Sequence, residues 1–242
     1  LFLKRITRDL DKEGKQVRFQ FLSVLSHELK APINAVEGYL NIIKEQQMGE
    51  SVSDYLEMID RSLARISGMR NLILDMLDLT KIESGKMSQN LEKLDLVTLA
   101  KESIETMMPL ARDKGISITL DSPESMPITA DPEEMEIILN NLISNAVKYN
   151  KDNGKVDCKL NIRDNKYILE VSDTGIGMDD EEINKLFKEF VRIKNRKTKH
   201  ITGSGLGLSI VKKLVELNEG QISVKSEPDI GTSFTIEFDL KD

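Results

Sequence analysis

The chain has 242 residues, enough for two modest domains, and its 39% hydrophobic and 31% charged residues are typical of a folded chain. With 34 basic and 41 acidic residues its net charge is -7, which argues against a nucleic-acid binder held by a basic surface. One cysteine excludes a disulfide framework or a cysteine zinc site within one chain, and two histidines exclude a multi-histidine metal site. Because no run of about 18 apolar residues occurs and the chain opens at Leu1 without a Met, we expect a soluble, reducing-compartment piece of a longer protein.

Two long helices are predicted in the first 90 residues. From Leu22 to Ile43 apolar residues recur in alternating steps of three and four, and the run from Leu56 to Leu77 repeats this pattern with an interruption at Arg70. The polar, glycine-containing segment between the two runs suits the connection of an antiparallel hairpin. One hairpin cannot bury both stripes, so we expect a homodimeric four-helix bundle over residues 20–88. Residues 1–19 are interpreted as the tail of a signalling helix.

The pattern changes after Ser84-Gly85-Lys86, where a glycine is placed to end the second helix. Beyond it, period-2 and helical segments alternate. Strands are predicted at Ile116–Leu120, Lys155–Ile162, Tyr167–Ser172, Gln221–Lys225 and Ser233–Phe238, and helices at Asp131–Asn150 and Leu206–Leu217. Helices mixed with hairpin-linked strands favour an α/β sandwich over residues 89–242, not a doubly wound parallel sheet.

The first chemical motif is Ser26–Pro32, on the first long helix. In the heptad pattern His27 takes the position furthest from the apolar seam, so we expect it to face solvent beside the carboxylate of Glu28. A carboxylate can hold an imidazole in one tautomer and leave its other nitrogen free as a nucleophile. Pro32 cannot donate to the carbonyl of Glu28, so a bend is expected there. The alternative is an ordinary exposed histidine.

A second motif runs from Asn140 to Tyr149. Asn141, Asn145 and Lys148 are spaced by four and three, so they share one helical face. Amide oxygens and an ammonium group together suit a magnesium–polyphosphate group, since Mg²⁺ takes oxygen ligands and lysine neutralises phosphate. The alternative is a solvated helix face.

A third motif, Asp173–Met178, directly follows the predicted strand that ends at Ser172. Gly175 and Gly177 let a ligand approach the backbone closely, and Asp173 can accept a hydrogen bond from an adenine amino group. A turn or a degenerate calcium loop is the alternative, although no flanking helix pair supports an EF-hand.

A fourth motif, Gly203–Leu208, opens a predicted helix, where free backbone N–H groups form an anion site. It is neither a Walker A loop nor a Rossmann fingerprint, because it lacks Gly-Lys-Ser/Thr and no strand precedes it. The basic run Val191–Ile201 just before it is either a solvated mobile loop or a lid over a phosphate site.

Together these motifs resemble the cytoplasmic core of bacterial two-component sensor histidine kinases. Ser26–Pro32 is similar to the H box of that family, and Asn141–Tyr149 is similar to its N box. The G1, F and G2 boxes are matched by Asp173–Met178, Phe187–Phe190 and Gly203–Leu208, in the order and spacing of the family. The wider superfamily of DNA gyrase, Hsp90 and mismatch-repair ATPases shares the N, G1 and G2 boxes, but not the H box and its helical hairpin.

The resemblance implies a dimeric bundle for histidine phosphotransfer followed by a Bergerat-type (GHKL) α/β sandwich that binds ATP and Mg²⁺. It makes His27 the phosphoacceptor and Glu28 the general base. Asn145 would hold Mg²⁺, with Asn141 and Lys148 at the phosphates. The other residues assigned to the nucleotide are Tyr149 and Asp173 at the adenine, and Gly175, Gly177, Gly203, Gly205, Leu206 and Gly207 in the glycine-rich boxes.

The implied partners are a second copy of the chain and the receiver domain of a response regulator, with no nucleic acid. The implied location is cytoplasmic, with an inner-membrane anchor, where there is one, in a region upstream. Three positions depart from the family pattern: Glu134 and Ile137 replace a basic residue and a glutamine, and Ala31 replaces Thr or Asn. The last departure predicts weak phosphatase activity. Cys158 is expected in the core, and His200 is given no role.

Two other functions compete with a protein-histidine kinase. A nucleotide-binding scaffold that has lost catalysis would act through the conformation of its dimer. An ATPase of the gyrase–Hsp90 type would release phosphate steadily without forming phosphohistidine.

Overall fold

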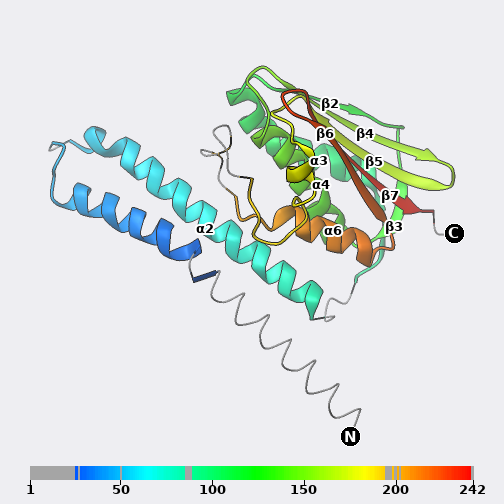
Figure 1. Ribbon diagram of the computed structural model, residues 1–242, viewed down its shortest axis with the longest axis horizontal. Coiled ribbons are helices and arrows are strands. Elements are labelled where there is room, and N and C mark those ends of the chain that lie inside the picture. Colours follow the sequence, from blue (N-terminus) through cyan, green and yellow to red (C-terminus); the bar gives the residue numbers. More distant parts are fainter. Residues whose placement is uncertain are drawn as a thin grey trace, which may run out of the picture. The chain divides into compact units, whose positions relative to one another are not determined.

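The computed structural model describes residues 25–26, 28–49, 51–84, 89–193, 198, 201 and 203–240 (Figure 1). The chain divides into two compact units, Leu1–Ile73 and Leu74–Asp242, and each is a structure in its own right. The break falls inside α2 (Leu56–Glu83), so the last turns of this long helix belong to the second unit.

The first unit is a helical hairpin. Residues 28–44 are helical, and a turn leads into a short 3₁₀ helix, η1 (Val52–Tyr55), and then into α2. The buried Tyr55 stabilises the turn, because its hydroxyl donates to the carbonyl of Gly49 (2.6 Å) and accepts from the amide of Met48 (3.0 Å). Across the hairpin, the Tyr39 side chain is hydrogen-bonded to Arg61 and raises its pKa.

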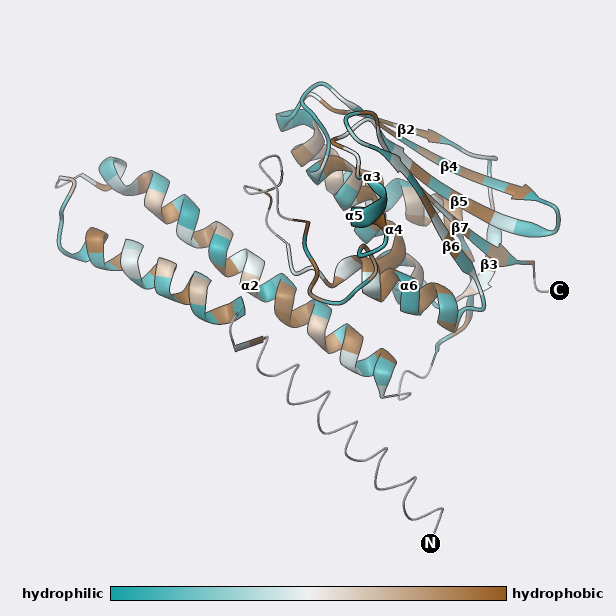
Figure 2. Cartoon of the chain, viewed as in Figure 1, coloured by the Kyte–Doolittle hydropathy of each residue, from teal (hydrophilic) through white to brown (hydrophobic). Residues whose placement is uncertain are grey.

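Within this unit, α2 has two apolar faces. One includes Leu72, which is buried, as is Tyr55 of the preceding η1. The other carries the predicted heptad stripe, of which four residues are exposed: Leu56, Leu63, Ile66 and Ile73. Figure 2 shows hydrophobic residues along much of α2. The predicted hairpin is confirmed, and a single copy leaves the stripe of α2 uncovered.

The second unit is an α/β sandwich built on a five-stranded sheet in the order β2-β4-β5-β7-β6. Its strands are β2 (Ser117–Asp121), β4 (Lys155–Arg163), β5 (Lys166–Asp173), β6 (Gln221–Glu227) and β7 (Gly231–Asp239). Only the β2–β4 pair in this sheet is parallel. Two short strands, β1 (Glu92–Asp95) and β3 (Pro127–Ala130), form a separate antiparallel pair.

Three helices lie together on one side of the sheet: α3 (Leu96–Asp113), α4 (Pro132–Lys148) and α6 (Gly207–Leu217) (Figure 1). A fourth, α5 (Asp180–Ile183), is a single turn after the G1 segment. In β4 the buried side chains alternate with more exposed ones, as expected for a sheet covered on one face. Cys158 is one of the buried residues, and burial raises the pKa of its thiol to about 12, so its predicted place in the core is confirmed.

Every predicted element of the second unit is present, with its bounds shifted by at most a few residues. The sequence reading missed α3, β1, β3 and α5. Pro109 lies inside α3, and a proline there interrupts a helical pattern, while the other three elements have only four residues each. The glycine predicted to end α2 lies outside the described residues. No helix in the described ranges is long and apolar enough to cross a membrane.

Candidate functional site

The amphipathic helix α4 places three of the predicted residues on one face. Asn141, Asn145 and Lys148 are half-buried there. The opposite face is anchored in the core by side chains that are almost wholly buried: Ile138, Leu142, Ile143 and Ala146. The helix starts at Asp131, whose carboxylate accepts from the amides of Glu133 (2.9 Å) and Glu134 (3.2 Å). The buried face and the N-cap hold α4 in place, so the orientation of its polar face is fixed.

Asn141 brings the N box and the G2 box together. Its Nδ2 donates to the carbonyl of Ile137 (2.9 Å), and its Oδ1 lies so close to Gly207 that a Cβ at that glycine would be 2.2 Å away. Only a glycine therefore fits at the start of α6 without moving Asn141. The close approach brings the backbone at the start of α6 next to the polar face of α4.

The N-terminus of α6 has backbone N–H groups that can bind an anion. Leu206 is buried and provides no side-chain cap. The first N–H groups of an α-helix have no partner within the helix, so they are available to an anion. Of the remaining loop residues, Gly203 is exposed, and Gly205 takes a left-handed φ of 75° beside Arg192.

Lys148 and Asn145 complete this end of the site. Burial lowers the pKa of Lys148, and the charge of Asp75 opposes that shift. Within the described ranges the Asn145 amide has no hydrogen-bond partner, although it is half-buried. An amide oxygen without a partner, beside an ammonium group and free N–H groups, fits a magnesium ion that also binds phosphate oxygens. Oxygen ligands of this kind suit Mg²⁺ better than softer metals.

Asp173 lies at the end of β5, as predicted. Its Oδ1 accepts from the amide of Gly175 (2.7 Å), and the backbone of Thr232 also donates to the carboxylate. Burial nevertheless raises the pKa of Asp173 to about 6, because desolvation outweighs these bonds. A carboxylate that pays this desolvation penalty is poised to accept a further donor from a ligand.

The G1 segment is joined directly to the end of α4. The amide of Ile176 donates to the carbonyl of Tyr149 (3.1 Å), and the Thr174 hydroxyl donates to Oδ1 of the buried Asn150 (3.3 Å). Gly177 has a φ of 60°, and a Cβ there would meet the carbonyl oxygen of Glu227 at 1.9 Å, so no other residue fits. The half-buried Tyr149 and Asp173 are therefore held at neighbouring points of the same site.

Sequence reasoning missed two residues here. Asn150 also donates from Nδ2 to the carbonyls of Ala146 (3.0 Å) and Lys155 (2.9 Å), so it links α4 to β4. Arg192 lies in the basic run Val191–Ile201; burial raises the pKa of Tyr149 and the charge of Arg192 opposes this shift, while the Arg192 side chain donates to the carbonyl of Ile201. The position of Asn150 directly after the N box was the available signal. Other basic residues of the run, from Lys194 to Lys199, lie outside the described residues.

Glu134, which stands where the family pattern has a basic residue, has a structural role. This side chain is fully buried, and its Oε2 accepts from Nδ2 of Asn218 (2.7 Å) and Nε2 of Gln89 (2.9 Å). Its other oxygen has no hydrogen-bond partner. Glu134 therefore joins α4 to the end of α6, away from the residues of the candidate site.

The H-box residues belong to the first unit. Glu28 and Ala31 are exposed on the helix, as its predicted outer face requires, while His27 itself lies outside the described residues. The predicted roles of His27 and Glu28 therefore stay predictions.

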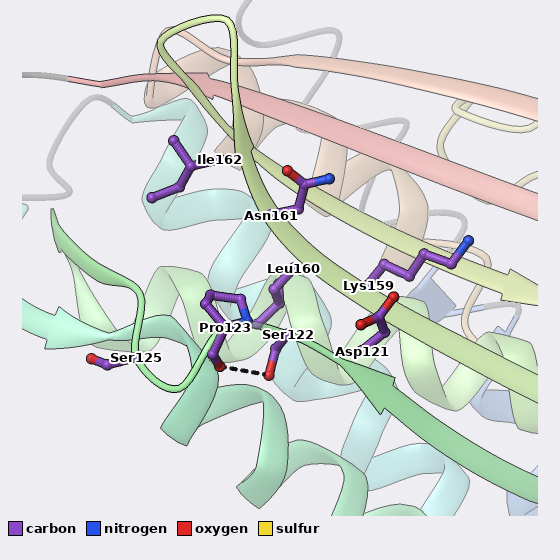
Figure 3. A pocket seen from close by; sticks show the side chains of 8 residues that line it. All are labelled: Asp121, Ser122, Pro123, Ser125, Lys159, Leu160, Asn161 and Ile162. Atoms are coloured by element: carbon purple, nitrogen blue, oxygen red, sulfur yellow. Dashed lines mark hydrogen bonds between the residues drawn. The ribbon is translucent and has the colours of Figure 1, made fainter.

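A separate hollow opens where β2 ends beside β4 (Figure 3). Its volume is about 510 Å³, and its lining includes Asp121 and Lys159, which are neighbours in the parallel pair, together with the turn from Ser122 to Ser125. None of the motif residues contributes to it. Within the described ranges no three His, Cys, Asp or Glu side chains gather as a metal-binding group.

Two family models match the chain. The His Kinase A (phospho-acceptor) domain matches residues 17–85, and the histidine kinase-, DNA gyrase B- and HSP90-like ATPase domain matches residues 130–242. The sensor protein EvgS of Escherichia coli (strain K12) is 34% identical over 90% of this chain and 18% of its own length. The non-motile and phage-resistance protein of Caulobacter vibrioides is 30% identical over 95% of this chain and 28% of its own length. The chain thus spans less than a third of either relative.

Solved structures agree with these matches. The histidine kinase AdeS of Acinetobacter baumannii superposes with a TM-score of 0.71 over 89% of this chain and 98% of that one, and its 23% identity makes this a likeness of fold. Full-length ShkA, solved in complex with AMPPNP, has a TM-score of 0.66 and 27% identity over 90% of this chain and 45% of that one. The histidine phosphoacceptor and ATPase domains are both present in the kinase order, and the chain belongs to the sensor histidine kinase family.

Proposed function

We propose that this chain uses ATP to phosphorylate its own His27 and then passes the phosphoryl group to an aspartate of a response regulator. The observation that carries the proposal is the meeting of three separate motifs in one unit. Tyr149 bonds to Ile176 of the G1 box, and Asn141 touches Gly207 of the G2 box. Family membership supports the same reaction.

In this proposal ATP lies between the G1 segment and the start of α6. Asp173 accepts from the adenine amino group, and Tyr149 borders the base. Gly175 and Gly177 let the nucleotide come close to the backbone. The G2 segment, from Gly203 through Gly205 and Leu206 to Gly207, meets the phosphates with backbone N–H groups. Binding of AMPPNP by the related ShkA supports a nucleotide site in this fold.

The polar face of α4 would hold the metal and the phosphates. Asn145 supplies an amide oxygen to Mg²⁺, while Asn141 and Lys148 lie at the phosphate oxygens. When bound, Mg²⁺ neutralises charge that develops on the transferring phosphate. Lys148 supplies an ammonium group to the same oxygens, and burial lowers its pKa while the charge of Asp75 opposes that shift.

Transfer needs positioning more than covalent help from the protein. A ring nitrogen of His27 attacks the γ-phosphorus, the bond from that phosphorus to the bridging oxygen of ADP breaks, and Glu28 takes the imidazole proton. In the second transfer the aspartate of the regulator attacks the same phosphorus and frees the histidine. The exposure of Glu28 supports a reaction on the outer face of the helix.

The proposed domains are a signalling-helix tail at 1–19, a dimerisation and phosphotransfer domain at 20–88, and an ATP-binding domain at 89–242. A homodimer would cover the exposed stripe of α2. A related kinase, ThkA, was solved in complex with the response regulator TrrA, and this supports a receiver domain as partner. We propose no nucleic-acid partner, in keeping with the net charge of -7, and a cytoplasmic location.

Incubation with γ-labelled ATP and Mg²⁺ tests the proposal. The wild-type chain should gain a label that is labile in acid and stable in base, and His27→Gln should lose it with nearly unchanged affinity for AMPPNP. His200→Gln, which replaces the other histidine of the chain, is the matched control and should keep the label. Bound but unused ATP would favour the scaffold, and steady phosphate release without label would favour the gyrase–Hsp90 type of ATPase.

We also propose weak phosphatase activity toward the phosphorylated regulator. The resemblance places a Thr or Asn at position 31, where it would hydrogen-bond the attacking water. Ala31 has no donor or acceptor and is exposed one turn beyond His27. Such a water would lose its positioning, which commonly costs about tenfold to a thousandfold in rate.

A further inference from the structure

The end of α2 is part of the ATP-binding unit. The second compact unit starts at Leu74, and two side chains of these last turns, Met76 and Leu79, are 4% and 0% exposed. Side-chain bonds join the polar residues of these turns to the rest of the unit.

One of these residues, Asp75, is bonded to the G2 segment. The Ser204 hydroxyl donates to its carboxylate (2.5 Å) and accepts from the amide of Leu206 (3.1 Å). An ion pair lies further along the helix, where the ammonium of Lys213 on α6 contacts Glu83 (2.6 Å) and also Glu189 (2.9 Å). The end of α2 is thus joined both to the loop before α6 and to α6 itself.

Asp75 is also electrostatically coupled to Lys148. Burial and the charge of Asp78 raise the pKa of Asp75, while the bond from Ser204 and the charge of Lys148 lower it. In turn the negative charge of Asp75 raises the pKa of Lys148 against burial. The two half-buried groups therefore attract each other electrostatically.

We propose that Asp75 is a competing anion at the phosphate end of the nucleotide site, where its carboxylate binds Ser204 and attracts Lys148 until a polyphosphate displaces it. This inference rests on the proposed function, because it takes Lys148 and the G2 segment as phosphate-binding groups. A carboxylate and a phosphate oxygen are both anionic acceptors, so they compete for the same ammonium group and the same loop.

Because of this competition, nucleotide binding and the docking of the end of α2 weaken each other. By thermodynamic linkage, whatever pulls Asp75 away strengthens polyphosphate binding, and bound polyphosphate weakens the hold on Asp75 by the same factor. Because α2 continues from the hairpin of the first unit, this gives the kinase a way to relate the state of that helix to its nucleotide affinity. Adenosine has no phosphate, so its binding affinity should not depend on Asp75.

The test is calorimetric binding of AMPPNP and of adenosine to the full chain. Asp75→Asn keeps the size and an acceptor for Ser204 but removes the charge, so it should bind AMPPNP about three- to tenfold more tightly and adenosine as wild type does. The gain should shrink at high salt, because charge competition is screened. Asp75→Ser, a smaller residue, should act in the same direction and guards against a folding defect of the first variant.

Asp78→Asn is the matched control. Asp78 is one turn further along α2, faces Lys81 at 3.8 Å, and has the same charge. Unchanged or weaker AMPPNP binding in both Asp75 variants would overturn the inference, as would an equal gain for adenosine or for Asp78→Asn. If wild type itself binds no AMPPNP, the proposed function fails first, whereas normal binding that is unaffected at Asp75 removes this inference alone.

Discussion

The hairpin and the ATP-binding unit differ in how far they bury their apolar side chains. In the second unit α4 is covered by the sheet on one side and by neighbouring helices on others, so Ile138, Leu142 and Ile143 are fully buried. In the first unit Leu63 and Ile66 remain 59% and 48% exposed. The ATP-binding unit therefore contains its whole core, whereas the hairpin presents a stripe that a second copy can cover.

The energetic consequence favours dimerisation of the hairpin. Burying a leucine or isoleucine side chain is worth roughly 1.5–3 kcal/mol when it goes from exposed to fully buried. Several such residues lie in a row along α2, so their burial can outweigh the entropy lost when two chains associate. In the second unit the apolar faces of α4 and α6 are already covered within the unit itself.

The largest expected effect is on association. Leu63→Asp places a charge in the exposed stripe of α2 and should convert the dimer to a monomer, while AMPPNP binding by the second unit stays intact. Ala64→Asp adds the same charge at an exposed neighbour off the stripe and should leave the dimer unchanged. Sedimentation velocity measures both outcomes, and a Leu63→Asp protein that stays dimeric would show that the stripe is not the interface.

A large effect confined to the second unit is expected at Asp173. Asp173→Asn should weaken adenine-nucleotide binding roughly tenfold to a hundredfold, because a charge-assisted hydrogen bond is worth about 1.5–3 kcal/mol. Calorimetry with AMPPNP gives the dissociation constants. The dimer should be unaffected, and equal constants for both proteins would remove Asp173 from the site.

A smaller effect is expected in the first unit at Ala31. Ala31→Thr should speed decay of the phosphorylated regulator severalfold in the presence of ADP and Mg²⁺, because the hydroxyl can position water again. Ala31→Val has a similar shape without the hydroxyl and is the control. If wild type already accelerates decay strongly and threonine adds nothing, the phosphatase uses other residues.

The last effect concerns stability and pH, again in the second unit. The pKa of Asp173 is raised to about 6 by burial, against an ordinary 3.8. Near pH 4 and below, its protonated form in the folded chain favours folding. As pH rises through 6 this contribution is lost, by a total of about 3 kcal/mol at most.

Asp173→Asn lacks that titration. In the absence of nucleotide, the stability of the variant relative to wild type should therefore rise between pH 4 and pH 7. The difference between their melting temperatures should move by several degrees, since about 1 kcal/mol shifts Tm by roughly 2–4 °C in a chain of this size. Calorimetric scans at both pH values measure it. A constant difference would mean that Asp173 titrates as it does in the unfolded chain.

The sequence alone determined what depends on neighbouring residues. The three-four spacing of apolar residues predicted the hairpin, alternation predicted the strands around Cys158, and the spacing of Asn141, Asn145 and Lys148 placed them on one helix face. Each of these features is encoded within a few turns or a single strand, where helical and sheet periodicity apply directly. The motif order was equally readable, because it needs no knowledge of packing.

The tertiary structure decided everything that joins distant segments. The contact of Asn141 with Gly207, the bond from Ser204 to Asp75, and the burial of Glu134 between Gln89 and Asn218 link positions far apart in the chain. No local pattern encodes such pairs, because they depend on how the sheet and its three helices pack together. The same holds for the exposed stripe of α2, which is distinguished from the buried face only once the hairpin has formed.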